Sequence, residues 1–575
     1  MSPSALDMRF VDAVARAADA EVSAALAILA EDYRAWPHRR LMEHVKLIVA
    51  TCRFKHSIHH GTNAPLEVAH AMSLRLLELQ MEDGLFYGGD NIASPPDSAF
   101  TINDACDTLE LIRRSDQTEH LPLLAEIESV IGAVTDAAEG ALVRGGIHTP
   151  NHRWEISAAL ARLHRRRPSP QAHRRILEWL GEGVDLNPDG TYSERSANYA
   201  AHVSNPSLTV IGDVLGIPSL HGAVAANLES TLALIHPDLT VETVHSRRQD
   251  QNSVFSLAPY LAMYRRYAIE HQRGDFAWAA HQALTAGVDG VATVLTELLL
   301  NPELSRELPA AEPPAASKKS LWTDAALAVD RRPERTLVVY GGSDYAQKSQ
   351  VRSGLANNPT FMRMFAGGAV LDAVRLSRTF FGLGPFRADG LDSSSAGGGY
   401  IMRETTGANY YQPLSEGERR PEGQYALEND GRFHAAMSFS HRKRDRVDMA
   451  TEVVVTPLPD GARIDIDLAG PKAAWALEFT FRGEGEFDGG EPLGNGDVHF
   501  TDGCGAYCLG STEFIITSDV PHRSEAPPIY SPGEDYEFLG ASDATTGRHA
   551  YLTGHSPGRF SIIVGARVDT SGKQE

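Results

Sequence analysis

Residues 301–319 read NPELSRELPAAEPPAASKK and separate two parts of the chain that have different hydrophobic periods. Proline and alanine dominate this stretch, which neither propagates a helix nor supplies a packed face, so it predicts an interdomain linker. The chain has 575 residues, too many for a single hydrophobic core. We therefore expect a helical domain over 1–300 and a sheet domain over 320–575.

The part before the linker has the helical period, with apolar residues recurring at intervals of three and four. Many helices joined by short Gly, Pro and Asn connections predict antiparallel helix pairs in a bundle, a solenoid or a closed toroid. The sequence has no repeat of fixed period, which disfavours the solenoid. The expected helices are 5–33, 38–54, 65–81, 98–114, 121–143, 151–165, 171–182, 206–215, 220–235, 253–267 and 276–300.

After the linker the apolar residues alternate, which is the period of a half-buried strand. Turn signals such as PDG at 459–461 and DG at 502–503 separate the alternating runs. This pattern predicts antiparallel sheets, with a β-sandwich as the expected architecture. The expected strands are 336–340, 432–439, 451–455, 463–468, 474–482, 513–517 and 559–564.

Charge and composition exclude several classes of protein. The chain has 53 basic and 75 acidic residues, and the net charge of −22 has the wrong sign for a general nucleic-acid binder. An acidic ligand therefore has to meet a local basic patch. No window approaches the roughly 18 apolar residues of a membrane span. The start has no signal-peptide pattern, so the chain as given is expected to be cytoplasmic, or secreted or periplasmic if a leader was removed.

The four cysteines do not form a recognisable framework. Cys504 and Cys508 are close in sequence, but no matching pair accompanies them, which disfavours a zinc site. We expect free thiols at these two positions and at Cys52 and Cys106.

A first polar cluster lies at the expected start of a helix, Thr149-Pro150-Asn151-His152. Threonine as the cap and proline in the first turn place Asn151 and His152 among the free backbone amides of the helix start. Those amides and the positive end of the helix dipole favour an anion such as a carboxylate. In the alternative interpretation, Asn151 caps the helix and His152 packs on its buried face.

A second polar cluster, DGTYSERSANY at 189–199, follows a tight turn. Irregular loops of this kind concentrate functional side chains. A tyrosine such as Tyr192 or Tyr199 near Arg195 can act as a base, because a cation lowers the tyrosine pKa from its ordinary value of about 10. The alternative is that both tyrosines are core aromatics and Arg195 lies on the surface.

A third cluster, TVHSRRQDQN at 243–252, is basic in an acidic protein. Its residues His245, Arg247 and Arg248 are candidates to bind an anionic substrate. The alternative is a solvated loop with ion pairs.

A fourth region combines histidines at 56–60 with the loop DGLFYGGDN at 83–91. The histidines lack the carboxylates and the spacing of a metal site, so we predict no metal. The aromatic and polar loop suits a sugar subsite, with Tyr87, Asp90 and Asn91 as binding residues.

The order of these features resembles a known family. A long helical half, an Asn-His pair opening a helix, an Asp-Gly-Thr-Tyr loop with a further tyrosine, and a sheet-rich second half are similar to the polysaccharide lyases of the heparinase II/III and alginate lyase type. The resemblance implies an incomplete (α/α) toroid followed by a β-sandwich. The Ala-His-Asn-Thr stretch, which holds a catalytic histidine in many heparinase-like members, does not occur in this sequence.

The resemblance also implies an activity, β-elimination at a uronic acid. Asn151 and His152 would neutralise the uronate carboxylate, and Tyr199 would transfer the proton. Arg195 and His245 are further catalytic candidates, and Tyr192, Arg247 and Arg248 are candidates for binding. The implied substrate is an acidic, uronate-containing oligosaccharide or polysaccharide. No cofactor, nucleic acid or membrane is expected to take part. The sequence is compatible with a homo-oligomer.

Two other functions fit the same sequence. A glycoside hydrolase on a helical toroid needs two carboxylates beside the scissile bond. A carbohydrate-binding protein without activity would use the aromatic loops alone. The carboxylates available to a hydrolase are Asp90, Asp97, Asp104, Glu155, Asp189 and Glu194.

Overall fold

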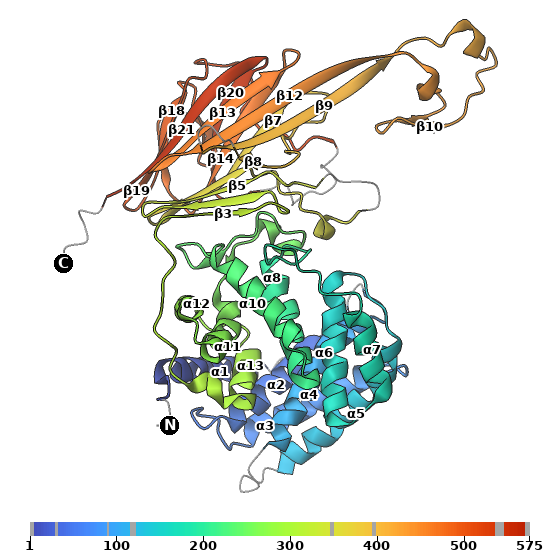
Figure 1. Cartoon of the computed structure of the whole chain (residues 1–575), viewed down its shortest axis with the longest axis vertical. Coiled ribbons are helices and arrows are strands. Elements are labelled where there is room, and N and C mark those ends of the chain that lie inside the picture. The colour runs from blue at the N-terminus through green and yellow to red at the C-terminus, as the bar shows by residue number, and fades with distance from the viewer. Residues whose placement is uncertain are drawn as a thin grey trace. The chain divides into compact units, whose positions relative to one another are not determined.

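The computed structural model describes residues 5–28, 33–88, 91–114, 122–344, 350–393, 398–534 and 545–569. The chain forms two compact units (Figure 1). The first contains the residues up to 246 and those from 253 to 315, and the second contains 247–252 and the residues from 316 onward. The chain thus passes between the units inside the Pro/Ala-rich stretch. One segment of the helical half, 247–252, belongs to the sheet unit.

The first unit is an (α/α) toroid with inner and outer helices. Nearly every residue between Asn151 and Leu163 of α6 is buried, whereas α7 buries just Ala172 and Ile176. Successive inner helices contact one another, α2 with α4, α4 with α6 and α6 with α9. The outer helices α3, α5 and α7 pack against them. The predicted fold class is confirmed.

The helices of this unit are α1 (Met8–Ile28), α2 (His38–Arg53), α3 (Ala64–Leu79), α4 (Pro95–Arg113), α5 (Pro122–Arg144), α6 (Pro150–Arg166), α7 (Pro170–Leu180), α8 (Ala197–Tyr199), α9 (Asn205–Leu215), α10 (Pro218–Leu232), α11 (Leu261–His271), α12 (Gly274–Ala286) and α13 (Val291–Leu300). A two-stranded ribbon, β1 (Thr240–Val241) with β2 (Phe255–Ser256), lies between α10 and α11. None of the helices in the described ranges is long and apolar enough to span a bilayer.

Two predicted helices in this unit were wrong in extent, and residues 29–32 of a third, predicted over 5–33, lie outside the described residues. The pattern at 276–300 is split into α12 and α13, because Gly287 and Gly290 have φ values of 131° and 61° that end one helix and start the next. The pattern at 253–267 begins with β2 and a 3₁₀ turn, and its helix starts at Leu261. In both cases the apolar residues keep the helical spacing although the backbone leaves the helix, so the spacing alone does not show where the helix starts or ends.

The beginning and the end of the helical unit are tied to each other. The Asp7 amide donates to the Ser305 carbonyl at 2.8 Å, and the Glu307 amide donates to the Ala5 carbonyl at 3.0 Å. The buried Arg265 guanidinium donates to the Asp7 carboxylate at 2.7 Å. This terminal clasp joins the segment before α1 to the segment after α13.

The second unit is a β-sandwich. One sheet has nine strands in the order β16-β17-β20-β14-β7-β6-β5-β4-β3, and the other has eight in the order β15-β18-β19-β21-β13-β12-β9-β8. Alternate residues of β14, including Leu477, Phe479 and Phe481, enter a core that also contains Ile464 of the other sheet. This packing explains the period of two after the linker.

The strands of the sandwich are β3 (Lys318–Trp322), β4 (Leu327–Arg331), β5 (Thr336–Tyr340), β6 (Met362–Ala366), β7 (Ala369–Arg378), β8 (Asp392–Ser393), β9 (Tyr400–Tyr411), β12 (Arg444–Pro457), β13 (Gly461–Ala469), β14 (Ala474–Arg482), β15 (Glu486–Asp488), β16 (Glu491–Gly494), β17 (Asp497–His499), β18 (Cys504–Leu509), β19 (Thr512–Ser518), β20 (Arg548–His555) and β21 (Gly558–Val568). A separate ribbon pairs β10 (Glu428–Asn429) with β11 (His434–Ala435).

The predicted strand 432–439 was wrong beyond β11. A 3₁₀ turn, Phe439–His441, follows it in the tip of the long hairpin formed by β9 and β12 (Figure 1). Phe433 in this tip is exposed, whereas Phe439 is buried and packs against the Tyr411 ring with centroids 4.9 Å apart.

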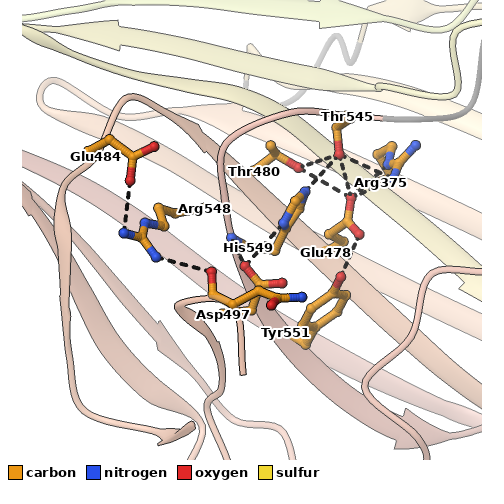
Figure 2. A network of polar contacts seen from close by, with 10 residues as sticks. Arg375, Glu478, Thr480, Glu484, Asp497, Thr545, Arg548, His549 and Tyr551 are labelled. Carbon is orange, nitrogen blue, oxygen red and sulfur yellow. Dashed lines mark hydrogen bonds and ion pairs between the residues drawn. The ribbon is translucent and has the colours of Figure 1, made fainter. Parts of the chain in front are cut away.

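The face of β14 turned away from the core carries a buried polar network (Figure 2). Arg375 of β7 pairs with Glu478 of β14 at 2.7 Å, and the Tyr551 hydroxyl of β20 donates to Glu478 at 2.9 Å. His549 of β20 lies 3.2 Å from the Asp497 carboxylate of β17. Burial and the Glu478 charge raise the Tyr551 pKa. The network joins four adjacent strands, so it helps to hold the nine-stranded sheet in register.

Candidate active site

The loop at 185–196 has a shape set by its own residues. The Asp189 carboxylate accepts hydrogen bonds from the Thr191 amide at 3.0 Å and from the Thr191 hydroxyl at 2.6 Å. Gly190 has φ +83°, and a Cβ there would lie 2.5 Å from the Ala226 carbonyl oxygen. The position therefore requires glycine. The Asp-Gly-Thr signal in the sequence encodes a tight turn and its side-chain bonds.

Asp185 attaches this loop to the first turns of α6. Its carboxylate accepts from the Arg153 guanidinium at 3.1 Å and from the Trp154 indole at 3.2 Å. The Ser193 hydroxyl donates to its other oxygen at 2.6 Å. Asp185 was not among the residues predicted from sequence. One feature of the sequence could have indicated a buried acceptor here. Arg153 and Trp154 directly follow the Asn-His pair, and both side chains are donors that need an acceptor once α6 is buried.

Asn151 and Glu194 connect the two polar clusters that the sequence singled out. Asn151 is in the first turn of α6, and its side-chain amide donates to the Glu194 carboxylate at 2.6 Å. Both side chains are buried, with 1% and 8% of their surface exposed. An amide nitrogen carries two N–H groups. Glu194 takes one of them, which fixes the orientation of the amide and leaves the second N–H for another acceptor.

Tyr199 lies where the helix changes its winding. Ser196 caps α8 by accepting from the Tyr199 amide at 3.1 Å, and α8 passes after Tyr199 into a π-helix, Ala200–Ser204. This π-helix continues directly as α9. Such π-turns inside helices occur frequently at functional sites. The Tyr199 side chain is half-buried, so it is both held by its neighbours and open to solvent.

Tyr192 is a core residue. Its hydroxyl donates to Asn205 at 2.8 Å, Asn205 donates to Asn227 at 3.0 Å, and Asn227 donates to the Gly190 carbonyl at 3.0 Å. Burial raises the Tyr192 pKa well above its ordinary value. These contacts favour the interpretation of Tyr192 as a core aromatic over its prediction as a substrate-binding residue.

Arg195 and His245 line the same small cavity behind α8. Arg195 has φ +54°, a left-handed conformation that is costly for a long side chain and is found at functional sites. The buried His245 lies on the same cavity wall. The cavity holds about 20 Å³, room for one water. Its lining comprises Thr191, Tyr192, Arg195, Ser196, Ala197, Ala200, Asn227, Ser230, Thr231, Leu234, Val241, Glu242, His245 and Tyr260.

His152 is half-buried and follows Asn151 in the chain. Its Nδ1 accepts from the His148 backbone amide at 3.4 Å, and the two imidazole rings meet edge to face with centroids 6.4 Å apart. The first turn of α6 therefore carries an imidazole one residue after the buried amide of Asn151.

Arg247 and Arg248 belong to the segment that clusters with the sheet unit. Arg247 makes a two-bond ion pair with Asp344, at 2.8 and 2.9 Å, and these bonds raise the Arg247 pKa. Gln251 donates to the Leu355 carbonyl at 2.9 Å. The ion pair agrees with the interpretation of this run as a loop held by charges, and a substrate would have to compete with Asp344 for Arg247.

The predicted sugar subsite is exposed in part. Tyr87 is 57% exposed, and Asn91 is also exposed and closes a turn with Gly88 through backbone bonds of 3.1 and 2.9 Å. Asp90 lies outside the described residues. An exposed tyrosine beside a tight turn offers a flat apolar face of the kind on which a sugar ring can stack.

The carboxylates considered for a hydrolase have structural partners. Asp97 pairs with Arg39 at 3.1 Å, Asp104 pairs with Lys46, and Glu155 accepts from Asn103 at 2.6 Å. Asp189 accepts hydrogen bonds from Thr191 within its own turn, and Glu194 accepts one from the Asn151 side-chain amide. Each described candidate thus has a structural partner in the folded protein.

Metal binding is not supported by a cluster of ligands. Across the described ranges, no group of three or more His, Cys, Asp or Glu side chains is arranged to hold a metal ion. Among the histidines at 56–60, His59 lies 3.3 Å from the Ser23 hydroxyl.

Solved structures share this architecture. Heparan sulfate lyase HepC from Pedobacter heparinus superposes with a TM-score of 0.51 at 10% identity, covering 94% of this chain and 79% of that one. The fold is that of the toroid-plus-sandwich polysaccharide lyases. Xanthan lyase from Paenibacillus gives a TM-score of 0.53 at 11% identity, covering 98% of this chain and 58% of that one. No family model and no curated protein sequence matches the chain.

Proposed function

We propose that this toroid-plus-sandwich protein is a polysaccharide lyase that cleaves a uronate-containing oligosaccharide or polysaccharide by β-elimination. The observation that carries the proposal is the Asn151–Glu194 hydrogen bond, which connects the start of α6 to the loop leading to Tyr199. The fold supports it, because solved structures that share it are named as lyases of heparan sulfate and xanthan.

Asn151 and the start of α6 would neutralise the uronate carboxylate. The proton on the carbon next to a carboxylate is weakly acidic, so its removal requires stabilisation of the negative charge that develops on the carboxylate oxygens. The second N–H of the Asn151 side-chain amide is a preorganised donor for that charge, and the positive end of the α6 dipole adds to the stabilisation. His152 would add a further donor or, when protonated, a positive charge.

Tyr199 would transfer the proton. Its ionised oxygen takes the proton from C5 of the uronate, the electrons form the C4–C5 double bond, and the C4–O4 bond breaks. The same hydroxyl then returns the proton to the departing O4. The products are a new hydroxyl end and an unsaturated uronate, and no water is consumed.

Arg195 and His245 would support this step. Arg195 precedes Ser196, the cap of the helix that carries Tyr199, so its guanidinium is a candidate to stabilise the tyrosine anion. His152 or His245 would act as the base in place of Tyr199 for a uronate whose C5 proton lies on the opposite face.

The glycan itself would contact more exposed groups. Tyr87 and Asn91 are the proposed stacking and hydrogen-bonding residues, and Asp90 belongs to the same loop. Arg247 and Arg248 of the sheet unit are proposed as anion-binding residues of that unit, where Arg247 would exchange its Asp344 partner for a carboxylate.

A screen of glucuronate-, iduronate-, mannuronate- and guluronate-containing oligosaccharides with ultraviolet detection tests the proposal. A lyase product has a conjugated double bond that absorbs near the edge of the ultraviolet, and a hydrolase product does not. We expect absorbance to grow with at least one substrate. New reducing ends without absorbance would identify a hydrolase, and binding without product would identify a carbohydrate-binding protein; either result would overturn the proposal.

A further inference from the structure

A second cavity lies in the helical unit, among the C-terminal parts of α4, α6, α9, α11 and α13. Its volume is about 300 Å³, against about 20 Å³ for the cavity behind α8. Arg162, on its wall, follows Asn151 by eleven residues in α6. At a rise of about 1.5 Å per residue, this is roughly 16 Å along the helix axis. The cavity is therefore separate from the candidate active site.

Two buried arginines line this cavity, and each is held by a carboxylate. Arg162 donates to the two Asp107 oxygens at 2.7 and 3.0 Å, and Arg266 donates to the two Asp213 oxygens at 2.8 and 3.0 Å. Arg162 makes one further bond to the Asn103 side chain, and Arg266 makes one to the Glu270 carboxylate. The two arginines are 8% and 9% exposed. A guanidinium has five N–H donors in a rigid fork, so both arginines retain donors beyond these bonds.

A third arginine has no such partner. Arg165, in the last turn of α6, lines the cavity and is exposed. Within the described part of the chain it forms no hydrogen bond and no ion pair. Its charge is therefore available to a ligand without the loss of an existing contact.

The remaining charged residues of the lining are an arginine and a carboxylate. Arg114 is the fourth arginine, and Glu297 is the third carboxylate beside Asp107 and Asp213. The lining thus has four cations and three anions, and two carboxylates outside it, Glu110 and Glu270, pair with Arg114 at 2.7 Å and with Arg266 at 2.8 Å. Burial and the Asp107 charge raise the Glu297 pKa, against the effect of the buried arginines. A proton on Glu297 makes the cavity more positive and supplies one more hydrogen-bond donor.

We propose that this cavity is a binding site for a small molecule that carries a carboxylate or phosphate group, held by Arg162, Arg165 and Arg266. Planar guanidinium groups with free N–H donors match the oxygens of both groups in two-bond contacts. The volume is at the lower end of the roughly 300–1,000 Å³ of small-molecule sites, enough for a sugar acid or a hydrated phosphate. The site does not depend on the proposed lyase activity.

Glu297 gives the site a pH dependence. The charged groups that face it are Asp107 of α4, Arg162 of α6, Asp213 of α9 and Arg266 of α11. As the pH rises, Glu297 loses its proton, and its negative charge then repels the bound anion. Affinity therefore decreases with rising pH, and Glu297→Gln removes this part of the dependence and strengthens binding at the higher pH.

Calorimetric titration of the full chain with sodium glucuronate and with inorganic phosphate, at constant ionic strength, tests the site. We expect saturable binding of at least one probe, and the probe that binds identifies the chemical source of the group. Arg165→Ala should weaken binding at least roughly tenfold, the effect of losing a charged hydrogen bond. Arg167→Ala is the matched control, because Arg167 pairs with Asp136 and Glu139 outside the cavity and should leave affinity unchanged.

Three results would overturn the proposal. They are the absence of saturable binding by both probes, equal weakening by Arg165→Ala and Arg167→Ala, and a glucuronate affinity whose pH dependence is the same in Glu297→Gln as in the unaltered protein. Thermal unfolding of each variant shows whether it is folded. A chain that binds glucuronate here but makes no ultraviolet-absorbing product would leave this site standing and overturn the proposed function alone.

Discussion

The two ends of helix α6 use polar residues in opposite ways. At its start, the Asn151 amide makes a single hydrogen bond to Glu194 in an irregular loop, and the chain continues from this loop through the left-handed Arg195 to a π-helix. At its end, Arg162 lies among regular helices and is fixed by a two-bond ion pair. Irregular backbone can aim a side chain at a reacting atom, whereas paired charges on regular helices shape a binding surface.

The largest expected effect is that of a change at Tyr199, in the helix that follows the 185–196 loop. If Tyr199 transfers the proton, Tyr199→Phe should lower kcat/KM by roughly 10² to 10⁴-fold with the fold intact. Turnover is measured by ultraviolet absorbance on the best substrate of the screen, and the fold by thermal unfolding. Tyr264→Phe is the control, because the Tyr264 hydroxyl donates to the Leu228 carbonyl in the core. A nearly active Tyr199→Phe would remove Tyr199 from the mechanism.

The next effect concerns the amide at the start of α6. Asn151→Ala removes a preorganised donor to the developing charge, so turnover should fall by roughly 10² to 10³-fold. Asn151→Asp keeps the size, lacks the donor and places a carboxylate against Glu194, and it should be at least as inactive. Equal activity of Asn151→Asp and the unaltered enzyme would show that the amide does not contact the substrate carboxylate.

These residues show most clearly what could be predicted from the sequence and what could not. The helical and alternating periods predicted the fold class, because burial on one face leaves a repeating signal. The pairing of Asn151 with Glu194 could not be read in this way, since 43 residues separate them and side-chain contacts leave no period. Tyr192 and Tyr199 looked alike in sequence. Their difference, one bonded to Asn205 in the core and one at a π-helix, depends on packing.

Between its two ends, α6 carries a buried carboxyl that offers a third test. Burial raises the Glu155 pKa from 4.5 to about 7, against the hydrogen bond from Asn103. The folded state therefore holds this proton more tightly than the unfolded chain, so the free energy of unfolding falls as the pH rises from about 4.5 through about 7.

Replacing Glu155 by an uncharged residue should remove this loss of stability at higher pH. Glu155→Gln should be more stable than the unaltered protein above neutral pH, by about 3 kcal/mol, and equal to it near pH 4. Urea unfolding at several pH values measures the difference. Glu178→Gln, on the exposed side of α7, is the control. A difference that does not change with pH would show that the Glu155 pKa is the same in the folded and unfolded states.

The smallest expected effect tests how rigidly the loop is held. Gly190→Ala should lower the free energy of unfolding by roughly 1–3 kcal/mol more than Gly183→Ala. Both glycines have left-handed φ values, +83° and +80°, but a Cβ at Gly190 meets the Ala226 carbonyl at 2.5 Å, whereas at Gly183 it meets nothing within 4 Å. Equal losses in urea unfolding would mean that the loop can move away from α10 at little cost.

The terminal clasp at Ala5, Asp7 and Arg265 also has a consequence for synthesis of the chain. Its partners Ser305 and Glu307 follow Asp7 by about three hundred residues. Proteins are made from the N-terminus, so α1 leaves the ribosome long before the segment that it pairs with. The buried Arg265 cannot satisfy all its donors until both have emerged. We therefore expect the toroid to close late in translation, so that its first helix is among the last elements to be fixed.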